Sequence, residues 1–136
     1  MIKKILIVDD DARNIFALSS VLTVKDYNCL SASSAAEGLR LIASDDQIAI
    51  VLLDMMMPDM DGYEMLTQIR SGAQRELAVI AVTARAMTGD KERCLAAGAN
   101  DYISKPIDLD LLIKVLETYH VEPNTAVGRD ADRTHS

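Results

Sequence analysis

Short apolar runs alternate along the chain with stretches in which apolar residues recur at helical spacing. Runs of four to eight apolar residues are typical of strands buried on both faces of a parallel sheet. The central run, Ile48–Leu53, ends abruptly on Asp54. We predict strands in the following places: residues 4–8, 27–31, 48–53, 77–82 and 101–104.

The segments between these runs have the spacing of amphipathic helices. A helix over 12–24 is predicted by the helical spacing of Ile15, Phe16, Leu18, Val21 and Leu22. Ser34 with Glu37 forms a capping box that opens a second. Further helices are expected beyond Asp61, over about 89–97, and after Asp108, which is a suitable N-cap. A strand–helix pair repeated five times predicts an α/β fold, with a doubly wound parallel sheet covered by helices on both faces.

The length of 136 residues suits one domain, and its net charge is −7. Phosphate contacts need Lys and Arg, so the charge argues against direct binding to nucleic acid or an anionic membrane. No stretch approaches the roughly 20 apolar residues of a membrane span. The three aspartates at 9–11 end the first apolar run too early for a signal peptide, so a cytoplasmic protein is expected.

Cys29 and Cys94 are far apart and have no metal-like spacing, which favours two small buried side chains in a reducing compartment. Residues 121–136 hold few large apolar side chains. We expect a flexible tail there and a single domain over residues 1–120.

Polar residues follow four of the predicted strands. The first strand is followed by Asp9 and Asp10, the central strand by Asp54, the fourth by Thr83 and the fifth closely by Lys105. The carboxyl ends of parallel strands share one edge of a sheet, so these side chains should converge. Taken singly, each aspartate is as easily a helix cap, the threonine a turn or cap residue, and the lysine a solvated surface residue.

Three carboxylates together would repel unless a hard cation such as Mg²⁺ neutralised them. Aspartate also forms covalent phosphoryl intermediates, and phosphoryl transfer needs mainly positioning and charge stabilisation. A lysine ammonium and a threonine hydroxyl could each bind a phosphoryl oxygen. The set therefore indicates a site that takes and holds a phosphoryl group on Asp54.

The chain resembles the receiver domain of two-component response regulators, from about Lys3 to Tyr119. Four motifs in this order carry the resemblance: Ile7-Val8-Asp9-Asp10, Leu53-Asp54-Met55-Met56-Met57-Pro58-Asp59-Met60-Asp61-Gly62, Val82-Thr83-Ala84 and Lys105-Pro106. It implies a CheY-like, flavodoxin-like fold with strand order 2-1-3-4-5. It also implies a signalling phosphoacceptor that assists its own phosphorylation and dephosphorylation and is not an enzyme.

The resemblance assigns a role to each residue of the site. It implies that Asp54 accepts phosphate from a histidine kinase or a histidine phosphotransfer protein. It implies that Asp10, Asp54 and the backbone carbonyl of Met56 bind Mg²⁺, with Mn²⁺ as an alternative, and that Asp9 acts mostly through a bound water. Thr83 and Lys105 would bind the phosphoryl group, and the Lys105–Pro106 peptide bond would be cis.

The resemblance also implies a switch, in which Thr83 moves toward the phosphoryl group and Tyr102 rotates inward. The surface of the fourth helix, fifth strand and fifth helix would then change for a partner, which includes the option of a homodimer. Two positions that vary in the family, Met56 and Arg85, would tune dephosphorylation. Because methionine orients an attacking water poorly, we hypothesise a long-lived phosphoryl group.

Three other functions compete with this one. An aspartyl-phosphate phosphatase would usually carry a second aspartate where Met56 stands. A flavodoxin-like cofactor binder would need a phosphate-binding loop after the first strand, where Asp9, Asp10 and Asp11 would repel phosphate. A receiver-like interaction module that works without phosphorylation is the third. Within the family, Met1 directly before the domain favours a stand-alone receiver over one cut from a hybrid kinase.

Overall fold

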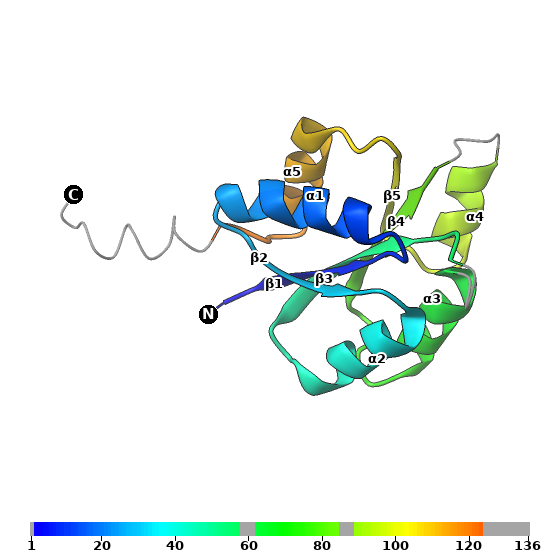
Figure 1. Ribbon diagram of the computed structural model, residues 1–136. Helices are drawn as coiled ribbons and strands as arrows, with labels where there is room; N and C mark the ends of the chain where they lie inside the picture. Colours follow the sequence, from blue (N-terminus) through cyan, green and yellow to red (C-terminus); the bar gives the residue numbers. More distant parts are fainter. Residues whose placement is uncertain (1, 58–61, 85–88, 124–136) are drawn as a thin grey trace.

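The computed structural model describes residues 2–57, 62–84 and 89–123 and contains one five-stranded sheet (Figure 1). Its strands are β1 (Lys4–Val8), β2 (Asn28–Ala32), β3 (Ile48–Asp54), β4 (Ala78–Thr83) and β5 (Asp101–Ser104). They are parallel, in the order β2-β1-β3-β4-β5. The predicted fold class and strand order are confirmed, and the strand bounds differ from prediction by about one residue.

Helices cover both faces of the sheet. They are α1 (Ala12–Val24), α2 (Ala35–Ser44), α3 (Gly62–Ser71), α4 (Asp90–Ala96) and α5 (Leu109–Thr118). In Figure 1, α1 and α5 lie on one face, and α2 and α3 lie on the other. The buried Cys94 of α4 belongs to the apolar cluster of the second face.

Side chains cap three of the helices, and two of these caps, at Ser34 and Asp108, are the ones that the sequence predicts. The carboxylate of Asp11 accepts from Arg13 N–H, and that of Asp108 accepts from Asp110 N–H. At α2, the Ser34 hydroxyl accepts from Glu37 N–H, while the Glu37 carboxylate reaches back to the N–H of Ser33. These caps satisfy amide donors that a helix leaves without intrahelical partners. The predicted start at Asp61 lies outside the described residues.

The central strand β3 is buried on both faces, as its apolar sequence predicts. Val51 and Leu53 lie in the cluster beneath α2 and α3, whereas Ile50 and Leu52 lie in the cluster beneath α1 and α5. All four are at most 2% exposed. Successive side chains of a strand point to opposite faces, so this strand anchors both halves of the core.

Two details differ from the sequence expectations. Leu22 of α1 is buried, but Phe16, which the helical spacing groups with it, is 73% exposed. The apolar residues of α1 span a wider arc than the sheet can cover. Val121, placed in the tail, is fully buried, and its N–H donates to Leu116 O at 2.8 Å. The packed core therefore continues to residue 121, which the sequence had placed in the tail. Residues 124–136 lie outside the described residues.

Candidate functional site

Strand register brings the predicted site residues to one edge of the sheet. Val8 of β1 pairs with Leu53 of β3, so Asp9 and Asp54 follow at the same level. Thr83 of β4 pairs with Ser104 of β5, and Lys105 comes next. The Lys105 N–H also donates to the Thr83 carbonyl at 2.7 Å. The convergence expected from the carboxyl ends of parallel strands is therefore present.

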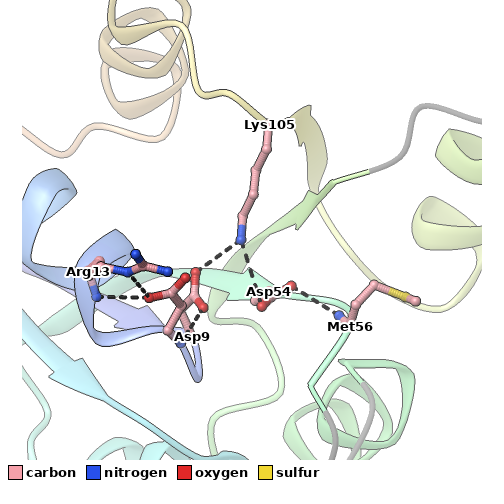
Figure 2. Close-up of polar contacts among 6 residues, drawn as sticks. Asp9, Arg13, Asp54, Met56 and Lys105 are labelled. Atoms are coloured by element: carbon pink, nitrogen blue, oxygen red, sulfur yellow. Dashed lines mark hydrogen bonds and ion pairs between the residues drawn. The ribbon is translucent and has the colours of Figure 1, made fainter.

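Lys105 reaches across this edge to two carboxylates (Figure 2). Its Nζ lies 3.1 Å from Asp9 Oδ2 and 3.8 Å from Asp54 Oδ2. Asp9 and Asp54 are each only 6% exposed. Buried carboxylates are costly without compensating charge or hydrogen bonds, so the ammonium partly offsets the cost of burying this pair. The Lys105–Pro106 peptide bond is cis, as the family resemblance implies.

Asp54 is held from its own loop as well. Its Oδ1 accepts from the backbone N–H of Met56 at 3.0 Å. Burial raises the pKa of Asp54 above its usual range, and the neighbouring Asp9 charge adds to this. The Met56 N–H and the Lys105 ammonium oppose the rise in pKa without cancelling it. The site therefore favours the arrival of further positive charge.

The three aspartates have the arrangement of a cation site. One carboxylate oxygen from each of Asp9, Asp10 and Asp54 lies within 4.8 Å of the others. Asp9 already accepts hydrogen bonds from Asp11 N–H and from Lys105 Nζ. Asp10 is exposed and Asp54 is buried. An all-oxygen set with one open side suits Mg²⁺, which binds a few carboxylates and retains waters.

The two switch candidates lie on neighbouring strands. Thr83 ends β4 and is 4% exposed, while Tyr102 lies on β5 and is half-buried. Burial raises the pKa of Tyr102, and the charges of Asp90 and Cys94 raise it further. Both of those groups belong to α4, so the phenol lies within electrostatic reach of that helix.

The two tuning candidates differ in what can be said of them. Met56 contributes its backbone N–H to the site, but its side chain is 63% exposed and extends away from the Asp54 carboxylate (Figure 2). Arg85 lies outside the described residues.

A cavity of about 540 Å³ opens beside Asp54, between α1 and the segment that leads into α5. We call it the α1–α5 cavity. Ala17, Leu18 and Val21 line it from α1, and Pro106 and Ile107 line it from the opposite side. The sequence did not predict this cavity. Helical spacing places 17, 18 and 21 on one side of the helix, but it does not show that the core leaves that side open.

A second cavity, of about 600 Å³, lies on the other side and includes Thr83 and Met56. We call it the α3–α4 cavity. Here the Arg93 guanidinium lies 4.9 Å from the centroid of the Tyr63 ring. The Tyr63 hydroxyl is 3.6 Å from Cys94 Sγ, and burial first, then Cys94, raise the pKa of Tyr63 to about 12. No sequence signal pointed to this contact between α3 and α4, because its residues are about 30 positions apart.

Two general expectations can also be compared with the structure. Cys29 and Cys94 are both free thiols. Cys94 is buried as predicted, whereas the prediction is wrong for Cys29, which is only half-buried. Across the described ranges, none of the helices combines the length and apolarity that crossing a bilayer requires.

Comparisons with known proteins agree with this geometry. The family model for the response regulator receiver domain matches residues 5–117. The sensor histidine kinase RcsC of Escherichia coli K12 is 39% identical over 115 residues, which are 85% of this chain and 12% of that protein. The chain thus spans about an eighth of the length of this curated relative.

Solved structures are similar over most of their length. A CheY-like response regulator receiver domain protein from Methanospirillum hungatei has a TM-score of 0.77 and 34% identity, covering 88% of this chain and 94% of its own. The receiver domain of Ssk1 from Saccharomyces cerevisiae, crystallised with the histidine phosphotransfer protein Ypd1, has a TM-score of 0.79 and 26% identity. That match covers 87% of this chain and 88% of the other. Fold, site and family model agree, and the chain belongs to the response regulator receiver domain family of two-component signalling.

Proposed function

We propose that Asp54 accepts a phosphoryl group from a phosphohistidine of a histidine kinase or a histidine phosphotransfer protein. The observation that carries this proposal is the position of Lys105 Nζ, 3.1 Å from Asp9 and 3.8 Å from Asp54 among three clustered carboxylates. A cation held beside a buried nucleophile is the arrangement that phosphoryl transfer needs.

The transfer uses groups already in place. Met56 N–H occupies Asp54 Oδ1, which leaves Oδ2, the oxygen nearer Lys105, to attack phosphorus. The P–N bond of the phosphohistidine breaks, and its electron pair returns to the imidazole. The Lys105 ammonium then pairs with one phosphoryl oxygen, and the Thr83 hydroxyl donates to another. The result is an aspartyl phosphate held by the ends of β3, β4 and β5.

Asp10, Asp54 and the Met56 carbonyl would hold Mg²⁺, or Mn²⁺ in its place. When bound, the ion supplies positive charge to the phosphoryl oxygens. The raised pKa of Asp54 and the clustered oxygens support this assignment. Asp9 has each of its oxygens in a hydrogen bond to a protein donor, which fits a role through an intervening water.

The α1–α5 cavity is where the donor protein docks. It is lined largely by apolar side chains and includes Asp54 and Lys105, so a partner seated on it brings its phosphohistidine to the acceptor. Val21 at its rim is 40% exposed. The similarity to a receiver crystallised with a histidine phosphotransfer protein supports a donor of this class. Direct nucleic-acid binding is no part of the proposal, in keeping with the net charge of −7.

Phosphorylation then changes the opposite side. Thr83 moves toward the phosphoryl group, and Tyr102 takes up the space that it leaves. Tyr102 packs against the apolar cluster that includes Cys94 of α4, which supports coupling to that helix. The surface formed by α4, β5 and α5 changes for a downstream protein, or for a second copy of the chain. This is a shift between two states that phosphate biases.

The chain is a signalling phosphoacceptor and not an enzyme with multiple turnover. Met56 stands where an aspartyl-phosphate phosphatase would need a general acid, and a thioether has no proton to give. The phosphoryl group is therefore long-lived.

We place the receiver over residues 1–120, extended by the buried Val121. We place the protein in the cytoplasm, where free thiols such as Cys29 and Cys94 persist.

Substitution of the acceptor tests the proposal. Wild-type protein incubated with acetyl phosphate and Mg²⁺ should gain one acid-labile phosphate by intact mass, and Asp54→Asn should gain none, because an amide is not a nucleophile here. Asp46→Asn, an exposed carboxylate away from the site, is the matched control and should label normally. Undiminished labelling of Asp54→Asn would refute the acceptor assignment.

A further inference from the structure

Met56 differs in exposure from the methionines around it. Its side chain is 63% exposed, whereas Met55 is 2%, Met57 is 6% and Met65 is 0% exposed. Oxidants in water reach exposed thioethers first. Among the methionines that the structure describes, Met56 is thus the accessible one.

Met56 is also tied to the acceptor through its main chain. Its N–H donates to Asp54 Oδ1 at 3.0 Å, while its thioether extends away from the carboxylates (Figure 2). The thioether is a weak hydrogen-bond acceptor and gains little by turning toward the site. Met56 therefore binds the Asp54 carboxylate through its backbone N–H and carries an apolar, oxidisable side chain on the same residue.

We propose that Met56 is a reversible oxidation site that shortens the lifetime of the phosphoryl group on Asp54. The oxidant is a peroxide. The sulfur takes one oxygen atom from hydrogen peroxide and loses two electrons, the O–O bond breaks, and water is the other product. This inference rests on the proposed function, because it concerns the stability of the aspartyl phosphate.

Oxidation changes what this side chain can do. A sulfoxide oxygen is a strong hydrogen-bond acceptor, and the methionine side chain has three rotatable bonds. Because Met56 is mostly exposed, turning it toward the phosphoryl group breaks little packing. The sulfoxide can then accept a hydrogen bond from a water placed behind phosphorus, where the thioether could not.

That water completes hydrolysis. Its oxygen attacks phosphorus, the bond between phosphorus and the Asp54 oxygen breaks, and the carboxylate leaves with the bonding electrons. The proton released from the water stays with the departing phosphate. Methionine sulfoxide reductases return the thioether, one enzyme for each sulfoxide epimer, so the long lifetime is restored only when both epimers are reduced.

The test compares phosphoryl lifetimes in the whole chain. Wild-type protein is phosphorylated with acetyl phosphate and Mg²⁺, the donor is removed, and acid-labile phosphate is followed with and without prior hydrogen peroxide. Peptide mass spectrometry locates the sulfoxide. Oxidation at Met56 should shorten the half-life about three- to tenfold, less than a full general base contributes. Treatment with both reductases should restore it.

Met56→Leu is the matched control, since it conserves volume and cannot be oxidised. It keeps every other methionine and both cysteines, so its half-life should not change with peroxide. Met56→Gln carries a permanent acceptor and should shorten the half-life without peroxide.

Three outcomes would overturn the inference: an unchanged half-life in protein oxidised at Met56, an equal change in Met56→Leu, or a Met56 that stays reduced while other methionines oxidise. If untreated protein takes up no phosphate on Asp54, the proposed function fails and this inference falls with it. If the protein is phosphorylated but the half-life of its phosphoryl group does not change on oxidation, the inference is overturned and the proposed function stands.

Discussion

The two sides of Asp54 are built differently. On the side of α1 and α5, the cavity is lined largely by apolar side chains and leads straight to the acceptor and Lys105. On the side of α3 and α4, the cavity holds Thr83 together with the stacked Arg93–Tyr63 pair and Asp90. An open apolar wall suits docking of a partner, whereas polar contacts between two helices can break and form again when one helix shifts. In the proposed function, Asp54 receives the phosphoryl group from the first side, and the change of structure is passed on through the second.

The largest expected effect comes from removing the positive charge beside the acceptor. Lys105→Ala removes the ammonium beside Asp54 and Asp9. Loss of one positioned charge-stabilising group should slow phosphorylation about 100-fold. Because the chemistry is common, the loss should be similar with acetyl phosphate and with a phosphohistidine protein, as measured by initial rates of acid-labile labelling.

The exposed lysine of α5, Lys114, gives a matched control, and Lys114→Ala should label at the wild-type rate. A loss confined to the protein donor would mean that Lys105 serves docking and not chemistry.

A smaller effect should separate docking from chemistry. Ala17→Glu places a charge on the wall of the α1–α5 cavity at an exposed helical position, so the fold should tolerate it. Transfer from a histidine phosphotransfer protein should slow about tenfold, because a carboxylate would be buried against an apolar partner. Labelling by acetyl phosphate should be unchanged.

Thr23→Glu adds the same charge to an exposed part of α1 that does not line this cavity, and it should leave both reactions unaltered. Equal slowing by the two variants would indicate a general charge effect and would remove the cavity from the docking model.

The smallest effect should appear at the contact between α3 and α4. Arg93→Ala removes the cation over the Tyr63 ring, a contact worth about 0.5–1 kcal/mol at an exposed site. Amide hydrogens of α4 should exchange about two- to fivefold faster, as followed by hydrogen–deuterium exchange. Phosphorylation rates should not change.

Lys91→Ala, at an exposed position in the same helix, should leave exchange as it is. Unchanged α4 exchange in Arg93→Ala would show that the stacked pair does not hold this helix in place.

Much of the site could be predicted because it depends on local sequence and one topological rule. Apolar runs define the strands, and parallel pairing places Asp9, Asp54 and Thr83 at one edge. Lys105 follows β5 directly, so its approach to this edge required no long-range information.

Contacts between helices could not be predicted in the same way. The spacing of Phe16 and Leu22 is equally helical, yet one is 73% exposed and the other fully buried. Val121 has the sequence context of a tail but packs in the core. Such outcomes depend on how much surface the neighbouring elements leave uncovered, and a period along one helix does not contain that information.

The sequence by itself determined the α/β class, the order of elements and the set of residues at the sheet edge, because each follows from an apolar run, a helical period of 3.6 residues or a strand end. Only the tertiary structure decided that Lys105 lies between Asp9 and Asp54, that Met56 presents its amide to the acceptor and its sulfur to solvent, and that unlike cavities flank the site. These features depend on distances between elements, which packing sets.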